Sequence, residues 1–125
     1  MTPNSQPSKI LAVVADLFFG AKIREAAKQA GATIEFVPGE DALWEKASAR
    51  PSLIILDLNH AAVDPVALIA KLKADPERQQ ASILGFVSHV QAGLIDRAQA
   101  AGCDLVLARS AFSANLPEIL GRYTG

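Results

Sequence analysis

The feature that most constrains the fold of this chain is a regular alternation of short apolar runs with segments of helical periodicity. The apolar runs lie at residues 9–15, 33–37, 52–57, 82–88 and 104–108. Most of them are continuous, with no apolar and polar alternation, which is typical of strands that are covered on both faces of a parallel sheet. We therefore predict five parallel strands connected by helices.

The segments between the runs carry the start and stop signals of helices. Gly31 follows an apolar helical stripe at the position of a C-cap glycine. Asp64 and Pro65 have the pattern of an N-cap followed by proline at the first helical position. In the last helical segment, Asn115 and Glu118 have the spacing of an N-cap and its third-position partner. These signals predict five helices.

Strands that alternate with helices over one domain predict an α/β fold. The expected architecture is a three-layer α/β/α sandwich whose five-stranded parallel sheet has the flavodoxin-like order 2-1-3-4-5. We assign residues 1–8 to a flexible N-terminal tail and residues 9–125 to a single domain, because 125 residues suffice for one domain. In such sheets ligands bind beyond the carboxyl ends of the strands, so those ends locate the site.

Composition excludes several classes of function. Twelve Lys and Arg residues against thirteen Asp and Glu residues give a net charge of −1, which argues against a nucleic-acid or membrane-surface partner. The single cysteine cannot form an internal disulfide, so we expect the cytoplasm as the compartment. The apolar stretch at residues 10–20 is interrupted by Asp16 and is too short to span a bilayer.

Polar side chains cluster at the predicted carboxyl ends of the strands. Asp16 follows the first run, Asp57 and Asn59 close the third, Ser88 ends the fourth, and Arg109 follows the fifth. A carboxylate can act as nucleophile, a second can help to hold Mg²⁺, and a hydroxyl and a cation can hold phosphoryl oxygens. The sequence therefore predicts a site that handles a phosphoryl group.

The chain resembles the receiver domains of response regulators in two-component signalling, and is similar to the chemotaxis receiver. The resemblance runs from about Lys9 to Tyr123. It rests on the strand rhythm and on Asp57-Leu-Asn59, Asp64, Leu72-Lys-Ala-Asp75, Ser88 and Ala101-Gly102-Cys-Asp104. It implies a stand-alone receiver without an output domain, with a histidine kinase or phosphotransfer protein as partner. It also implies no enzyme activity beyond self-phosphorylation and dephosphorylation.

The resemblance implies a role for each polar residue at the strand ends. Asp57 matches the phospho-accepting aspartate, and Asp16 matches the second member of the acidic pair that binds Mg²⁺. Asn59 holds the position whose backbone carbonyl completes the metal site. Ser88 matches the conserved hydroxyl residue, and Arg109 occupies the place of the invariant lysine. Receivers of this kind repack, and often dimerise, through the face made by their fourth helix, fifth strand and fifth helix.

Several positions depart from the receiver pattern. Ala15 replaces the first acid of the pair, so we expect a weakened Mg²⁺ site. Arg109 replaces lysine and has a planar fork suited to constant pairing with Asp57. Ser110 replaces a proline that is usually cis, so we expect a trans bond there. Val106 replaces the aromatic residue that couples the site to the output face.

These departures leave two versions of the function and one rival. The receiver either accepts phosphate on Asp57 or acts by protein binding without phosphorylation, and the departures favour the second version. The rival is a small metal-binding protein or enzyme that uses Asp16, Asp57, His60 and His89 at the same sheet edge. Imidazole and carboxylate groups suit zinc or iron.

Aromatic residues and the lone cysteine provide further expectations. Phe18 and Phe19 follow the first strand, where one can be buried and the other exposed for contact with a partner. Phe112 either packs inward or lies on the interaction face. We expect Trp44 in the core or on a half-buried helix face, and Cys103 as a small buried residue.

Overall fold

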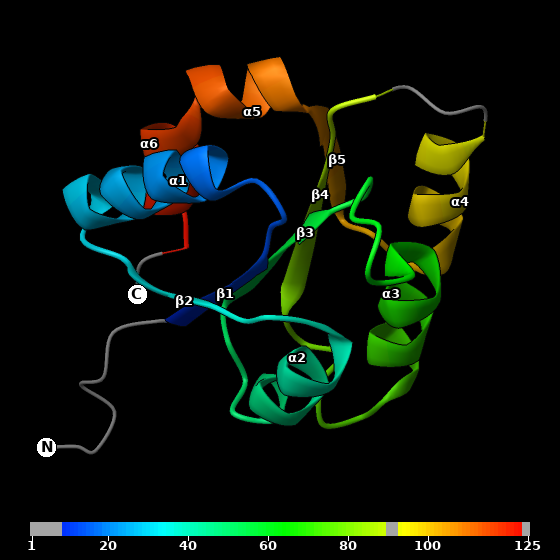
Figure 1. Cartoon of the computed structure of the whole chain (residues 1–125). Coiled ribbons are helices and arrows are strands. Elements are labelled where there is room, and N and C mark those ends of the chain that lie inside the picture. The colour runs from blue at the N-terminus through cyan, green and yellow to red at the C-terminus, as the bar shows by residue number, and fades with distance from the viewer. Residues whose placement is uncertain (1–8, 90–92, 124–125) are drawn as a thin grey trace, which may run out of the picture.

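The structure, a computed structural model, describes residues 9–89 and 93–123. Its centre is a parallel five-stranded sheet with helices on both faces (Figure 1). The strands are β1 (Lys9–Val13), β2 (Thr33–Phe36), β3 (Leu53–Asp57), β4 (Ser82–Val87) and β5 (Leu105–Ala108). Their order, β2-β1-β3-β4-β5, confirms the predicted three-layer sandwich with flavodoxin-like topology. The predicted tail at residues 1–8 lies outside the described residues.

Six helices are described, one more than predicted. They are α1 (Leu17–Ala30), α2 (Glu40–Ala47), α3 (Pro65–Ala74), α4 (Leu94–Ala101), α5 (Arg109–Ala114) and α6 (Leu116–Gly121). The predicted last helix corresponds to α6, and α5 is the additional helix before it. Asn115 lies at the predicted N-cap of α6, but its side chain makes no capping hydrogen bond, and its Nδ2 donates to the carbonyl of Ala111 at 3.0 Å.

The predicted ends of the earlier helices are confirmed. Gly31 closes α1 with a φ of 75°, in the left-handed region that favours glycine, and its N–H donates to carbonyls of the last turn. Asp64 caps α3 by accepting a hydrogen bond from the Ala67 N–H, and Pro65 begins that helix. These local signals act as expected because each pairs backbone N–H or C=O groups that the helix end leaves without a partner, within a few residues of the signal.

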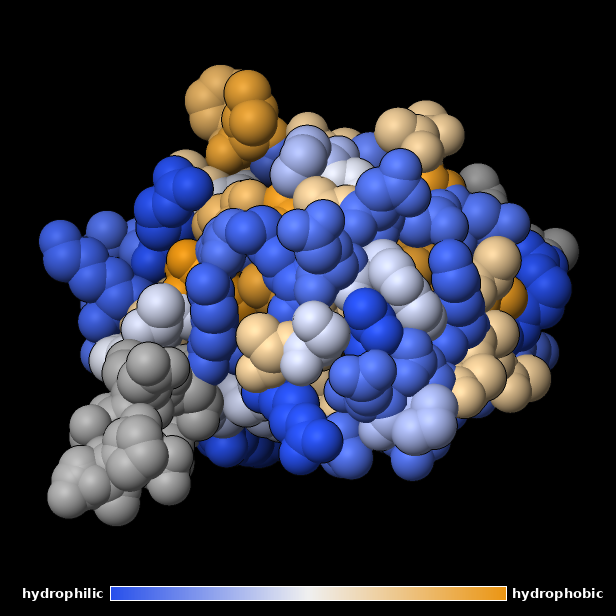
Figure 2. All heavy atoms as spheres, turned by 90° about the horizontal axis from the view of Figure 1, so that it is seen from below, coloured by the Kyte–Doolittle hydropathy of each residue, from blue (hydrophilic) through white to orange (hydrophobic). Residues whose placement is uncertain are grey.

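The core consists of two apolar clusters, one on each face of the sheet. One cluster lies between the sheet and α2, α3 and α4, and the other between the sheet and α1, α5 and α6. All five residues of β3 are buried, which explains why its first four residues are apolar before Asp57 ends the strand. The surface seen from below in Figure 2 is mostly hydrophilic, as expected when apolar side chains are gathered between the layers.

Candidate functional site

Asp57 ends β3 and is the buried charged residue of the described chain, with 7% of its surface exposed. Its Oδ1 accepts a hydrogen bond from the backbone N–H of Asn59 at 2.9 Å. The strand order places the end of β3 between β1 and β4, in the middle of the sheet. Asp57 therefore lies where ligands bind in folds of this kind.

The Asn59 side chain connects the loop after β3 to the end of β4. Its Oδ1 accepts hydrogen bonds from the backbone N–H groups of Ser88 at 2.7 Å and His89 at 3.1 Å. Its Nδ2 donates to the His89 carbonyl at 3.2 Å. The sequence prediction concerned only the backbone carbonyl of Asn59. The structural role of its side chain was missed, because no local pattern shows which strand end an amide will reach.

Asp16 lies at the end of β1 and caps α1. Its Oδ1 accepts hydrogen bonds from the N–H groups of Phe18 at 2.9 Å and Phe19 at 3.2 Å. Its Oδ2 accepts a bond from Nη2 of Arg109 at 2.6 Å. The bond from Arg109, and after it the backbone N–H of Phe19, hold the pKa of the Asp16 carboxyl below its ordinary value. Asp16 is therefore held in its charged form by two kinds of donor.

The expectation that Arg109 pairs with Asp57 is wrong, because its ion pair is with Asp16. Arg109 begins α5, which packs on the same face of the sheet as α1. From there its side chain reaches toward the start of α1, and its guanidinium lies 4.4 Å from the centre of the Phe19 ring. A planar guanidinium gains both from this stacking and from the charged hydrogen bond. Arg109 is thus held by two neighbours on α1.

Three buried aromatic rings pack next to the ion pair between Arg109 and Asp16. Phe19 lies edge-on to Phe86 and Phe112, with ring centres 5.0 and 5.9 Å apart, and Phe86 and Phe112 are 5.6 Å apart. Phe19 is therefore the buried member of the predicted pair, and Phe18 is 89% exposed. Phe112 packs inward. Leu17, which the sequence analysis did not single out, is 85% exposed beside Phe18.

The contacts of Asp16 weaken further the Mg²⁺ site that the sequence predicts to be weak. Asp16 already accepts two backbone N–H groups and a guanidinium, whose positive charge opposes a metal ion at the same carboxylate. Ala15 offers no carboxylate in its place. Asp57 is then left with Asn59 as the remaining member of the predicted ligand set. Mg²⁺ is usually held by one or two protein carboxylates together with water, so the remaining site is weaker than the one that the resemblance implies.

The rival metal site is not formed either. Within residues 9–89 and 93–123, no three His, Cys, Asp or Glu side chains lie close enough together to hold a metal ion. His60 turns toward its own loop, where its Nδ1 accepts a hydrogen bond from the Ala62 N–H at 3.1 Å. The grouping of Asp16, Asp57, His60 and His89 is therefore not supported as a transition-metal centre.

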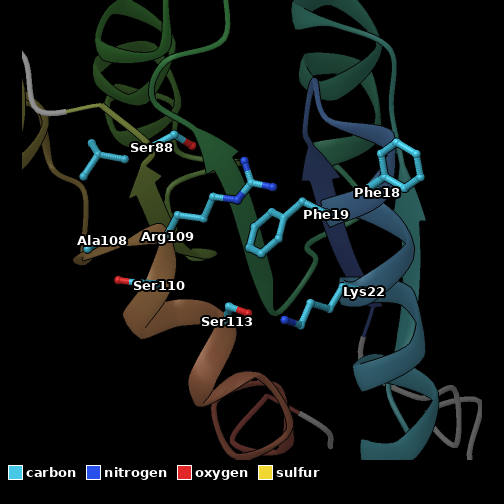
Figure 3. Close-up of a pocket in the computed structure, with 9 residues that line it drawn as sticks. Phe18, Phe19, Lys22, Ser88, Ala108, Arg109, Ser110 and Ser113 are labelled. Carbon is cyan, nitrogen blue, oxygen red and sulfur yellow. The ribbon is translucent and has the colours of Figure 1, made fainter.

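A cavity of about 560 Å³ lies between α1 and α5, beside the Arg109 ion pair (Figure 3). Two predicted site residues, Ser88 and Arg109, line it, whereas Asp57 and Asn59 do not. Ser88 is common to both groups of residues, because its backbone N–H also donates to Oδ1 of Asn59.

The remaining residues that the sequence singled out have clear positions. The peptide bond before Ser110 is trans, as expected. Val106 is half-buried against the cluster under α2, α3 and α4. Cys103 is buried, and burial raises the pKa of its thiol. Trp44 is half-buried, with its ring next to Lys71 and Arg78.

Comparison with solved structures shows the receiver fold. A response regulator from Hahella chejuensis has 21% identity and a TM-score of 0.81, covering 93% of this chain and 94% of that chain. The chemotaxis response regulator CheY4 of Vibrio cholerae has 20% identity and a TM-score of 0.78, covering 93% and 98%.

The receiver domain of a sensor histidine kinase from Pseudomonas aeruginosa, which holds a magnesium ion in its active-site cleft, has 20% identity and a TM-score of 0.78, covering 93% and 96%. No family model and no curated protein matches the sequence. Over the described part of the chain, no helix has the length and apolar character needed to cross a membrane.

Proposed function

We propose that this chain, which has the receiver fold, is an atypical response-regulator receiver of two-component signal transduction. It acts by binding a protein partner, without Mg²⁺-dependent phosphorylation of Asp57. The ion pair between Arg109 and Asp16 is the observation that carries this proposal. We place this activity in the cytoplasm, with a histidine kinase or phosphotransfer protein as the partner. A second copy would bind through α4, β5 and α5.

The ion pair removes two groups that phosphorylation of Asp57 would need. Transfer of a phosphoryl group to a carboxylate brings two negative groups together, so it depends on positive charge placed around the transferred oxygens. In the predicted site that charge came from Mg²⁺ and Arg109. Arg109 is directed to Asp16 and not to Asp57, and it in turn occupies the carboxylate expected to bind the metal. Asp57 therefore lacks both sources of positive charge.

The structure offers a surface for recognition beside the same ion pair. Leu17 and Phe18 are 85% and 89% exposed at the start of α1, immediately after Asp16. Apolar side chains that are exposed next to a charged pair are typical of protein contacts. The Asp16 cap and the Arg109 pair hold the start of α1 in place, so a partner would meet a preformed surface.

The first test is phosphorylation itself. The protein is incubated with acetyl phosphate and Mg²⁺, and its intact mass is measured beside the Pseudomonas aeruginosa receiver domain treated in the same way. We expect no phosphoryl adduct on this chain. A stoichiometric adduct that requires Mg²⁺ and is lost in Asp57→Ala would contradict the proposal and favour the phosphorylated version of the function.

The second test is partner binding. A pairwise interaction assay against the histidine kinases and phosphotransfer proteins of the same genome identifies the partner. We expect its affinity to be unchanged by EDTA and by Asp57→Asn, and to fall in Phe18→Ala. Loss of binding on chelation of Mg²⁺ or in Asp57→Asn would show that the partner reads the phosphorylation site. Failure of every such protein to bind would remove the partner class from the proposal.

A further inference from the structure

We propose that the cavity between α1 and α5 binds a small organic anion with an apolar body, held by a carboxylate or phosphate group. The cavity has about 560 Å³, within the usual range for small-molecule sites. Its lining residues are Phe18, Phe19, Lys22, Val87, Ser88, Ala108, Arg109, Ser110 and Ser113. The inference goes beyond the proposed function and does not depend on it.

The charge of the lining points to an anion. Lys22 and Arg109 are its charged members, and no carboxylate belongs to it. Lys22 forms no ion pair with any residue that the structure describes. The bond from Arg109 to Asp16 uses one of the five N–H groups of the guanidinium, and Asp16 lies outside the lining. Donors of both residues therefore remain available to a ligand.

Hydroxyl groups add neutral donors to this positive wall. Ser113 lies on α5 opposite Lys22 on α1, and their polar ends point toward one another in Figure 3. Ser88, which follows β4, also lines the cavity, as does Ser110 on α5, whose hydroxyl points away from Lys22 in Figure 3. A hydroxyl can rotate to donate to an oxyanion, and an ammonium supplies a charge-assisted bond. The arrangement suits a group with several anionic oxygens.

The rest of the cavity is apolar. The ring of Phe19 forms part of the wall beneath Arg109, and Val87 and Ala108 contribute aliphatic surface. Phe18 stands at the rim with 89% of its surface exposed. Cavities lined by apolar side chains with a few converging polar groups are typical of ligand sites. A flat apolar body would pack on this wall while its anionic group reaches Lys22.

Small side chains keep the cavity open. Ala108 ends β5 and Ser110 follows Arg109 on α5, so the chain neighbours of Arg109 leave space beside it. Arg109 itself is drawn toward α1 by Asp16 and Phe19. The ion pair between Arg109 and Asp16 therefore shapes this cavity.

The test uses three probes of the same shape. ¹⁵N-labelled full-length protein is titrated with 2-naphthoate, 2-naphthyl phosphate and the neutral 2-naphthamide. We expect saturable shifts of the amides of Lys22, Arg109 and Ser113, with at least one anion binding about tenfold more tightly than the amide. The tighter of the two anions identifies carboxylate or phosphate as the preferred group.

Matched variants assign the charge to Lys22. Lys22→Met should weaken binding of the preferred anion about tenfold and leave 2-naphthamide unchanged. Lys28→Met, on the exposed side of the same helix, is the control and should change neither affinity.

Three results would overturn the inference. They are no saturable shift at millimolar probe, equal affinity for the amide and the anions, and equal weakening by both lysine variants. None of them bears on acetyl phosphate or partner binding, so failure here is distinct from failure of the proposed function.

Discussion

Replacing Gly85 by alanine tests how the interior of β4 supports the loop that follows Asp57. A Cβ at this position would lie 2.8 Å from Cδ1 of Leu58 and 2.9 Å from its Cδ2 and Cγ. Leu58 is 3% exposed and lies between Asp57 and Asn59, so it cannot move without disturbing the core or the site. Overpacking of this kind costs about 1–3 kcal/mol, against a gain of about 0.5–1 kcal/mol from replacing a strand glycine.

A double-mutant cycle separates the clash from any general effect of the substitution. Leu58→Ala removes all three contacting atoms and by itself costs about 2–5 kcal/mol. In that background Gly85→Ala should be neutral or stabilise the fold by about 0.5–1 kcal/mol. The coupling energy is then about 1–3 kcal/mol, above the few tenths expected for independent sites.

The assay is urea unfolding, followed by circular dichroism and by Trp44 fluorescence. Coincident transitions from the two probes justify a two-state free energy of unfolding. Gly121→Ala is the matched control, because nothing lies within 4 Å of its added Cβ. In ¹⁵N spectra the Asn59 and His89 amides should shift in Gly85→Ala, since Leu58 adjoins Asn59. Equal costs of Gly85→Ala with and without Leu58→Ala would refute the reasoning.

Two further predictions concern the ion pair and its aromatic support. Phe112→Ala should lower the free energy of unfolding by about 3–5 kcal/mol because the ring is fully buried. Phe18 is exposed, so Phe18→Ala should change the free energy of unfolding by less than about 0.5 kcal/mol. Equal urea midpoints for the two variants would contradict the aromatic cluster. The depressed pKa of Asp16 implies stabilisation that is present above the ordinary carboxyl pKa and lost as pH falls through the folded-state pKa. In Arg109→Met, ¹³C NMR titration should show the pKa of Asp16 rising toward its ordinary value, and the pH dependence of the free energy of unfolding should become smaller. An unchanged pKa of Asp16 would show that Arg109 is not the main cause of its depression.

The sequence by itself determined the layers of this fold. Strands buried on both faces must be apolar along their length, and helix ends need caps within a few residues, so both leave local signals. The run that became β3, the Gly31 cap and the Asp64 cap were predicted for this reason. The start of α6 after Asn115 was predicted from local spacing in the same way, whereas the short helix α5 was not predicted.

Only the tertiary structure decided which charged groups meet. Asp16 and Arg109 are 93 residues apart, and their pairing depends on α1 and α5 sharing one face of the sheet above the Phe19 ring. No periodicity in the sequence indicates whether Arg109 pairs with Asp16 or with Asp57, because a long side chain pairs with the partner that packing brings within reach. The contacts of the Asn59 side chain arise in the same way. The strand ends were readable from the sequence, but the pairing of Arg109 with Asp16 was settled by packing.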